Sequence, residues 1–265
     1  MATPESTELL SLAVESVRRA ATLVGEMRAA AVTSIETKST PTDPVTEADR
    51  AAERLVVEGL AAARPGDLVL GEEGGFRPVG EKADPDAVRW LLDPIDGTVN
   101  FVYGIPAYGV SLAAEVDGTV VAGVVRNVVT GEEWTAVRGG GAWRDGKRLS
   151  GSGVTDLGRA LIGTGFGYAA ERRRRQAEVL VRLLPRIRDI RRIGSAALDL
   201  CAVAEGRLDA FYEQGLNAWD SAAGGLVAEE AGLLVTGLRG EPAGPGMTLV
   251  APPSIHGELH DLLAG

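Results

Sequence analysis

The segment WLLDPIDGTVNF, which begins at Trp90, most constrains how this chain can fold. Its apolar run ends in two acids, Asp93 and Asp96, and the proline between them excludes the interior of an ordinary helix. The segment therefore predicts a strand that carries two carboxylates to one point beyond its end. Two hard oxygen ligands at such a place suit a divalent cation such as Mg²⁺.

The residues after the acids extend this interpretation. Gly97 and Thr98 come at a turn or a helix start, where backbone amides can hold phosphate oxygens. The segment thus predicts a metal-assisted phosphate site. The alternative is a surface turn in which an aspartate caps a helix and the glycine takes a positive φ.

Other acids stand in similar settings. Glu72 lies in GEEGG, directly after a short apolar run, so a second strand is expected to end in carboxylates. Asp220 precedes a run of small residues where a helix can begin, and Asp49 opens a segment with apolar residues at helical spacing. Each acid alone is explained by a helix cap. Their combination with Asp93 and Asp96 favours one acidic site.

These residues resemble the inositol monophosphatase family, within the lithium-sensitive, magnesium-dependent phosphatase superfamily. The sequence around these residues is most similar to the SuhB-type bacterial branch. The matching blocks occur in order over nearly the whole chain: Lys38 with DPVTEAD, then GEE, WLLDPIDGTVNF, RRIGSAALDL and YEQGLNAWDSAAG. Two departures, Val99 for a second threonine and Gly74 for a serine, replace no expected ligand.

The resemblance implies two magnesium sites that share one aspartate. The expected ligands of the first ion are Glu72, Asp93 and the carbonyl of Ile95, and those of the second are Asp93, Asp96 and Asp220. Mn²⁺ is expected to substitute in part.

The resemblance also implies how water and phosphate are held. Thr98, paired with Asp49, is expected to position or deprotonate the attacking water, and Asp49 is the essential half because threonine alone is a poor base. Glu72 would also hold a third, weaker metal. The amides of Gly97 and Thr98 would bind the phosphate, and Lys38 is a candidate loop contact near the third metal.

Groups outside the metal cluster must recognise the alcohol. The substrate contacts that the resemblance implies are Asp96, Gly194, Ser195, Ala196, Glu213 and Asp220. Glu213 is the main candidate, because a carboxylate that accepts from vicinal hydroxyls favours a polyol. It could equally pair with an ammonium group, which leaves histidinol phosphate open.

The fold that the resemblance implies is α/β (α+β layered), an αβαβα five-layer sandwich of the inositol monophosphatase and fructose-1,6-bisphosphatase type. We expect a single compact unit with the site between two halves. Residues 1–150 would form an α+β half with most metal ligands, and residues 151–265 an α/β half with Asp220 and the alcohol-recognition residues. The boundary is expected in the glycine-rich stretch 139–158.

Periodicity predicts the individual elements. Helices are expected near the N-terminus, after Asp49, and near 171–184, 195–205 and 219–231. The expected strands are 67–71, 88–93, 107–116, 119–128, 132–138, 160–165, 208–212, 232–236 and 247–251.

Composition fits an ordinary soluble enzyme. The start of the chain lacks the pattern of a signal peptide, and no apolar run approaches the length of a bilayer, so we expect a cytoplasmic protein. Cys201, the single cysteine, has apolar neighbours and is expected to be a buried structural thiol. His256 and His260 favour a surface helix over a metal pair.

The net charge of -10 argues against a general nucleic-acid surface. Nine arginines nevertheless gather in residues 171–192. The apolar spacing of this segment favours the solvated face of an amphipathic helix. A subunit contact or an acidic partner is the alternative, and a homodimer is expected.

Three functions remain open. The first is a magnesium-dependent phosphomonoesterase that hydrolyses inositol monophosphate with a metal-activated water. The second keeps this chemistry on fructose 1,6-bisphosphate, histidinol phosphate or 3'-phosphoadenosine 5'-phosphate; the nucleotide is disfavoured because Val99 and Asn100 replace a typical Lys-Glu pair. The third is a partner-binding protein with secondary catalysis.

Overall fold

Eight strands form the larger of the two main sheets in the computed structural model, which describes residues 4–30, 35–37, 44–80, 83–84 and 86–265. The strands, in spatial order, are β10 (Lys147–Arg148), β9 (Gly141–Arg144), β8 (Glu133–Val137), β7 (Thr119–Asn127), β6 (Gly109–Val116), β5 (Arg89–Asp96), β3 (Leu68–Gly71) and β4 (Gly75–Pro78). Only β3 and β5 pair in parallel. The central strands β5 and β6 are buried almost throughout, because helices cover both faces of the sheet.

Five strands form the smaller sheet. Their spatial order is β12 (Asp189–Arg191), β11 (Leu161–Thr164), β13 (Ala210–Glu213), β15 (Thr248–Ala251) and β14 (Leu234–Thr236). The first three run parallel, so β11 and β13 end at the same edge of the sheet. A separate pair, β1 (Ile35–Thr37) and β2 (Pro44–Thr46), lies beside α3 (Thr98–Tyr103).

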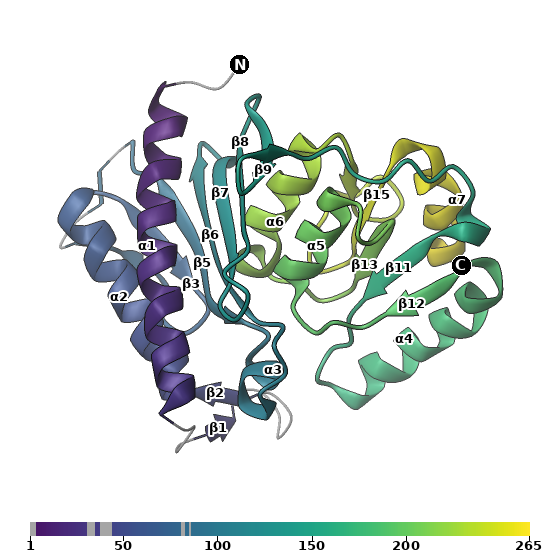
Figure 1. Ribbon diagram of the computed structural model, residues 1–265, viewed down its shortest axis with the longest axis horizontal. Coiled ribbons are helices and arrows are strands. Elements are labelled where there is room, and N and C mark those ends of the chain that lie inside the picture. The colour runs from purple at the N-terminus through teal and green to yellow at the C-terminus, as the bar shows by residue number, and fades with distance from the viewer. Residues whose placement is uncertain (1–3, 31–34, 38–43, 81–82, 85) are drawn as a thin grey trace.

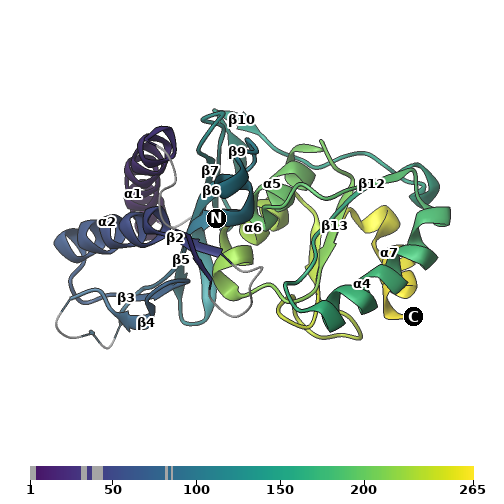
Figure 2. The same cartoon turned by 90° about the horizontal axis from the view of Figure 1, so that it is seen from below.

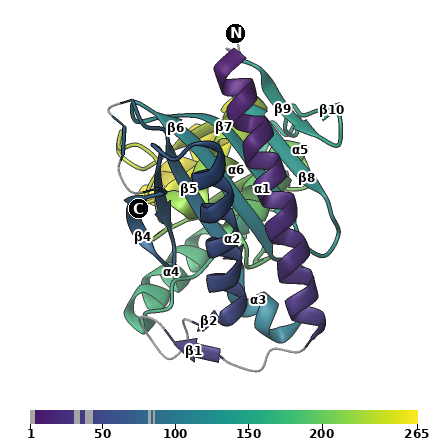
Figure 3. The same cartoon turned by 90° about the vertical axis from the view of Figure 1, so that its left-hand side faces the viewer.

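Helices and sheets alternate in five layers (Figures 1 and 2). Helices α1 (Pro4–Ala29) and α2 (Glu47–Ala63) cover the outer face of the larger sheet, as the side view in Figure 3 shows. Between the sheets lie α5 (Ala196–Glu205) and α6 (Ala218–Glu230), and beyond the smaller sheet lie α4 (Ala170–Leu183) and α7 (Pro253–Ala264). The five-layer sandwich expected from the sequence is confirmed.

The position of α5 in the middle layer explains why this helix is so apolar. Residues 196–204 of α5 are all buried, since this helix has a sheet on either side. Cys201 lies in this helix with no exposed surface, and burial raises its pKa well above the ordinary value. The expected structural thiol is confirmed.

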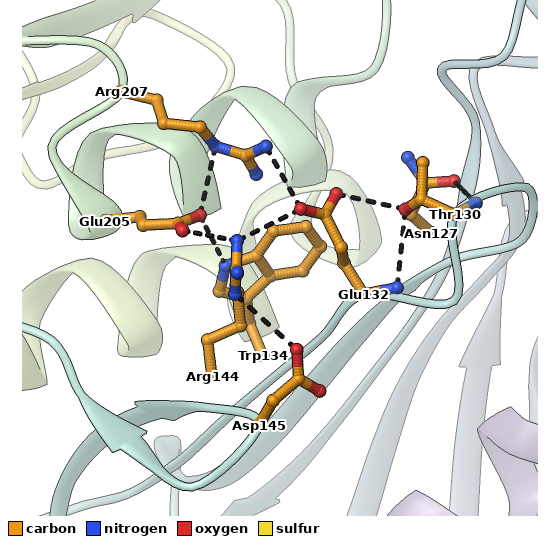
Figure 4. A network of polar contacts seen from close by, with 8 residues as sticks. All are labelled: Asn127, Thr130, Glu132, Trp134, Arg144, Asp145, Glu205 and Arg207. Atoms are coloured by element: carbon orange, nitrogen blue, oxygen red, sulfur yellow. Dashed lines mark hydrogen bonds and ion pairs between the residues drawn. The ribbon is translucent and has the colours of Figure 1, made fainter.

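A network of charged side chains joins the larger sheet to the far end of α5 (Figure 4). Glu132 precedes β8 and Glu205 ends α5, and the two acids share Arg144 and Arg207. The guanidinium of Arg207 also lies 5.4 Å from the centre of the Trp134 ring. The C-terminal end of α5 is thereby attached to the larger sheet.

Most predicted helices and strands occur within a few residues of their expected bounds. The expected helix after Asp49 begins earlier, at Glu47, because Thr46 and Asp49 form a reciprocal capping box. The expected boundary stretch, 139–158, contains β9 and β10, which continue the larger sheet. The proposed division into residues 1–150 and 151–265 stays a prediction. No helix of the described residues is long and apolar enough to cross a membrane.

Candidate active site

The end of β5 brings Asp93 and Asp96 into the interior between the halves. Both side chains are buried, at 2% and 8% exposure. The pairing register with β6 shifts between the two acids, at the position of Pro94, which has no amide hydrogen to donate. The amide of Ile95 donates to Asp93 Oδ1 at 3.0 Å. The expectation of a strand that ends in carboxylates is correct.

Asp96 is held by the N-terminus of α5. The Ser195 hydroxyl and the Ala197 amide donate to Asp96 Oδ2, the latter at 2.7 Å, and the Ala196 amide donates to Oδ1 at 3.3 Å. A helix N-terminus stabilises a negative charge in this position. Ser195 and Ala196 therefore bind a site aspartate here.

Thr98 and Asp49 meet as the resemblance implied. The Thr98 hydroxyl lies 3.2 Å from Asp49 Oδ1 and 3.0 Å from the carbonyl oxygen of Ile95. Asp49 has no exposed surface, and its other oxygen accepts from the amide and hydroxyl of Thr46. The capping box thus fixes the carboxylate that faces Thr98.

Glu72 follows β3, in a turn organised by a buried acid of α2. Glu53, at 3% exposure, accepts from the amide of Glu73 at 3.0 Å and pairs with Arg77 at 2.7 Å. A Cβ built on Gly71 would lie 2.5 Å from Glu53 Oε2, so a larger residue there would have to displace this carboxylate. The sequence analysis did not single out Glu53, because an acid inside an amphipathic helix usually faces solvent.

Asp220 and Glu213 approach the site from the C-terminal half. Asp220 lies in the first turn of α6, where its carboxylate accepts from the Asn217 amide at 2.6 Å. Glu213 ends β13, and a Cβ on Gly165 would lie 1.9 Å from its Oε2, so its carboxylate lies against the end of β11. Within the described chain, Glu213 accepts no hydrogen bond.

One cavity of about 380 Å³ collects these residues. Its lining includes most of the expected site residues, namely Glu72, Asp93, Ile95, Asp96, Gly97, Thr98, Gly194, Ala196, Glu213 and Asp220. Asp49 and Ser195 lie just behind it, in contact with Thr98 and Asp96. Lys38 lies outside the described residues.

The cavity also contains two residues that the sequence analysis placed on a solvated surface. Arg172, in the first turn of α4, and Arg192, before the α5 segment, both line it. The interpretation of 171–192 as a solvated face holds for Arg174 and Arg175, which pair with Glu171 on the exposed side of α4. It does not foresee that Arg172, which is half-buried, and Arg192, which is exposed, border the cavity. Helical spacing does not reveal such a contact, because the loop around the first turn decides which way its side chains face.

Two backbones cross closely beside the cavity. Gly97 has φ 96°, and a Cβ there would lie 3.0 Å from the Ala107 carbonyl and 3.1 Å from the Gly194 carbonyl. The Asn100 amide nitrogen donates to the carbonyls of Ala107 and Ile193, at 2.7 and 2.9 Å. These contacts fix the start of α3 against the loop that leads into α5.

Two acids of the cavity have strongly raised pKa values. Burial raises the pKa of Asp93 well above its ordinary value, and the carboxylates of Glu72, Asp96 and Asp220 raise it further. Burial and the charge of Asp96 raise the pKa of Asp220 in the same way, against a hydrogen bond from the Asn217 amide. Such mutual repulsion indicates that Asp93 and Asp220 have no positive charge close enough to offset it.

Asp96 and Glu213 are affected less strongly. Burial raises the pKa of Asp96 to about 6, while the hydrogen bonds from the α5 N-terminus oppose the rise. Burial and the charge of Asp96 raise the pKa of Glu213 to about 7, and Arg192 opposes this. Glu213 thus titrates near neutral pH.

The donor set fits divalent cations. It consists of hard carboxylate oxygens and one carbonyl, gathered in one cavity. In the described part of the chain, no three acidic, histidine or cysteine side chains are already arranged around a metal position. Asp96 and Asp220 face protein donors instead.

The two histidines lie on α7, away from this cavity. His256 bonds to the Thr236 hydroxyl and His260 accepts from the Arg239 amide. They belong to a C-terminal helix, as expected.

Comparison with known proteins identifies the relatives of the chain. A sequence model of the inositol monophosphatase family matches residues 5–265. Inositol-1-monophosphatase SuhB of Mycobacterium tuberculosis is 53% identical over 232 residues, which cover 85% of this chain and 80% of that protein. Nus factor SuhB of Pseudomonas aeruginosa is 43% identical over 88% of this chain and 86% of its own length. The crystal structure of the extragenic suppressor protein SuhB from Bartonella henselae superposes with a TM-score of 0.89 at 34% identity, over 97% of this chain and 98% of that one.

Proposed function

The chain belongs to the inositol monophosphatase family, and from this membership we propose that it is a magnesium-dependent phosphomonoesterase that hydrolyses inositol monophosphate to inositol and phosphate. The observation that carries the proposal is the meeting of Glu72, Asp93, Asp96 and Asp220 with the Thr98–Asp49 pair in one cavity. A phosphate monoester needs positive charge at its oxygens and a positioned water, and this arrangement can supply both.

Glu72, Asp93, the Ile95 carbonyl, Asp96 and Asp220 would hold the cations. Bound there, Mg²⁺ would neutralise the negative charge of the phosphate and the charge that develops on the leaving oxygen. It would also favour ionisation of the attacking water. Mn²⁺, with similar oxygen preference, would substitute in part.

The chain's own residues then position the reactants. The Thr98 hydroxyl, which contacts Asp49, would hold the attacking water. The buried Asp49 carboxylate would act as the general base and accept the proton of that water by way of the Thr98 hydroxyl. The amides of Gly97 and Thr98, at the start of α3, would donate to phosphate oxygens. The close packing of Gly97 on Gly194 keeps this turn in place.

Glu213 supports a polyol as the alcohol. Its carboxylate lines the cavity and has no hydrogen-bond donor within the described chain, so it is available to vicinal hydroxyls. A substrate without hydroxyls would leave this partly buried acid unpaired, which is unfavourable.

A phosphate-release screen tests the proposal. Purified protein with Mg²⁺ would be assayed on inositol 1-phosphate, histidinol phosphate and other sugar, polyol and nucleotide phosphates. We expect inositol 1-phosphate among the substrates with the highest kcat/KM. A preference for histidinol phosphate would reassign Glu213 to an ammonium group, and no release from any ester would refute the phosphatase function.

A further inference from the structure

A second cavity lies at the edge of the smaller sheet where its parallel strands begin. Its volume is about 450 Å³, and the charged side chains in its lining are those of Asp156, Arg159, Arg188, Arg207 and Asp209. Arg188 and Asp209 directly precede β12 and β13, whereas Glu213, in the catalytic cavity, ends β13. Because β11 pairs in parallel with both β12 and β13, the strand starts and the strand ends lie at opposite edges. The second cavity is therefore separate from the catalytic one.

Three segments each bring one arginine to this cavity. Arg159, before β11, has no side-chain hydrogen bond or ion pair with the part of the chain that the structure describes. Arg188 donates from Nε to the Arg159 carbonyl at 2.8 Å, and its two terminal nitrogens have no partner within the same residues. The donors of Arg159 and Arg188 thus lie side by side and are available to a ligand.

Arg207 is held in place from the other side. Its guanidinium pairs with Glu132 at 3.2 Å and with Glu205 at 3.0 Å, and it lies over the Trp134 ring (Figure 4). Its orientation, like that of Arg188, is therefore set by the protein before a ligand arrives. Such preorganisation reduces the entropy that binding costs.

The two acids of the lining are engaged by backbone amides. Asp156 Oδ1 accepts from the Gly158 amide at 2.9 Å, and Asp209 Oδ2 accepts from the Leu161 amide at 2.7 Å. Among the described residues, neither acid forms an ion pair with an arginine of the cavity. One oxygen of each carboxylate is left to accept from a hydroxyl of a ligand.

These groups favour a phosphate as the ligand. A guanidinium presents paired donors that match phosphate oxygens, and two such groups adjoin here. The volume lies within the range of about 300 to 1,000 Å³ that is usual for small-molecule sites. An ester with hydroxyls would use the acids as well, whereas inorganic phosphate would use the arginines alone.

We propose that the cavity around Arg159 and Arg188 is a second anion site, which binds a phosphate group away from the catalytic cavity. The inference does not rest on the proposed phosphatase function, because none of the metal-binding acids takes part. Arg207 joins the site to the C-terminal end of α5, and the other end of this helix binds Asp96. A ligand at the second site would therefore contact a residue that anchors the central helix.

Calorimetric titration of metal-free protein at low ionic strength tests the site. Inorganic phosphate and ribose 5-phosphate are the probes, and ribose is the uncharged control, which should not bind. Without metal, the acids Asp93 and Asp220 oppose phosphate in the catalytic cavity. We expect R159Q and R188Q each to weaken phosphate binding by about 10- to 100-fold, as for the loss of a charge-assisted hydrogen bond.

Three further variants locate the ligand. R186Q removes an exposed arginine that pairs with Glu258, two residues before Arg188, and should leave the affinity unchanged. R188K should retain part of the affinity, because lysine keeps the charge but not the paired donors. R172Q removes a cation of the catalytic cavity and should also leave the affinity unchanged. Thermal unfolding checks that each variant is folded; R159Q tests the site without disturbing a described side-chain contact.

The outcomes are distinct. Loss of binding in R172Q with normal binding in R159Q and R188Q would place the phosphate in the catalytic cavity and overturn the proposal. Absence of binding to the wild type would overturn it too. If the ester binds at least about tenfold more tightly than inorganic phosphate, the ligand is an ester, and equal affinities identify inorganic phosphate. Since no turnover is measured, a failed phosphate-release screen would leave these results unaffected.

Discussion

Asp93 and Asp220 illustrate, at the scale of single residues, how a binding site differs from a structural ion pair. Asp93 is buried and Asp220 is half-buried, neither has a cationic partner among the described residues, and desolvation raises the pKa of each well above its ordinary value. A buried acid that served folding alone would be paired with a cation. Their environment is unfavourable until a cation binds.

Replacement of these acids by amides should separate catalysis from folding. We expect D93N and D220N each to lower kcat by at least about 10³, because each removes a metal ligand. The metal-free variants should unfold at equal or higher temperature than the wild type, since one repelling charge is gone. Kinetics with Mg²⁺ and thermal unfolding in chelator measure both effects, with D261N on the exposed end of α7 as the control. Loss of fold with normal activity in the folded fraction would make the residue structural.

Glu213 should affect substrate choice more than chemistry. E213Q keeps the shape, removes the charge and replaces an acceptor oxygen by a donor. We expect kcat/KM for inositol 1-phosphate to fall by about 10- to 100-fold, or about 1.4 to 2.7 kcal/mol. p-Nitrophenyl phosphate, which has no hydroxyls on its alcohol, should be hydrolysed nearly as before. Equal losses on both esters would place Glu213 in the catalytic apparatus.

The same residue should make the stability of the metal-free protein depend on pH. The pKa of Glu213 rises from 4.5 to about 7 on folding because of burial and the charge of Asp96. The folded state thus favours the protonated acid, so its contribution is complete below pH 4.5 and is lost as the pH rises through 7. The loss is about 3 kcal/mol, at about 1.4 kcal/mol per pKa unit. Urea unfolding of the wild type and E213Q at pH 5 and pH 8 measures it, and an equal pH dependence in both would contradict the assignment.

At the scale of elements, the sequence predicted best what depends on local pattern. Apolar runs and their spacing predicted β5 to β8, and the Asp93–Asp96 spacing predicted carboxylates at a strand end. The short strands β4, β9, β10 and β12 were not expected, because two to four residues carry too little periodicity. Contacts between elements distant in sequence, such as Asp96 with the α5 N-terminus or Arg172 with Gly215, leave no local signal at all.

Helix α2 should influence the metal site through Glu53. Its carboxylate holds the Glu73 amide and Arg77, and so fixes the turn that presents Glu72. We expect E53Q to raise the Mg²⁺ concentration for half-maximal activity by about 10- to 100-fold, as for other partners that orient a ligand. E58Q, an exposed acid on the same helix, is the control.

The readout distinguishes positioning from general stability. A structural role alone would lower the amount of folded protein without changing the Mg²⁺ requirement of the remainder. E53D should restore part of the metal affinity, because it retains the charge. An unchanged Mg²⁺ requirement in folded E53Q would exclude the positioning role.

At the scale of the whole molecule, metal should govern both activity and stability. Activity should vanish in excess chelator and return with Mg²⁺, partly with Mn²⁺, while Ca²⁺ should inhibit because it tolerates looser and higher coordination. Mg²⁺ should also raise the unfolding temperature, since it binds only the folded state. Phosphate release and thermal unfolding over a metal titration measure these effects. Full activity in chelator would refute the metal-dependent function.

The layers of the molecule place the acids expected to bind metal and the residues on the alcohol side of the cavity on different elements. The acids at Asp93, Asp96 and Asp220 lie on β5 and α6, next to the central helix α5, which is attached at both ends. Glu213 comes from the end of β13 in the smaller sheet, and Arg172 from the first turn of the outer helix α4. Mutations in the outer layers can therefore alter which alcohol is accepted while the hydrolytic apparatus stays intact. On such a scaffold, the substrate range can change in evolution while the residues that carry out hydrolysis are retained.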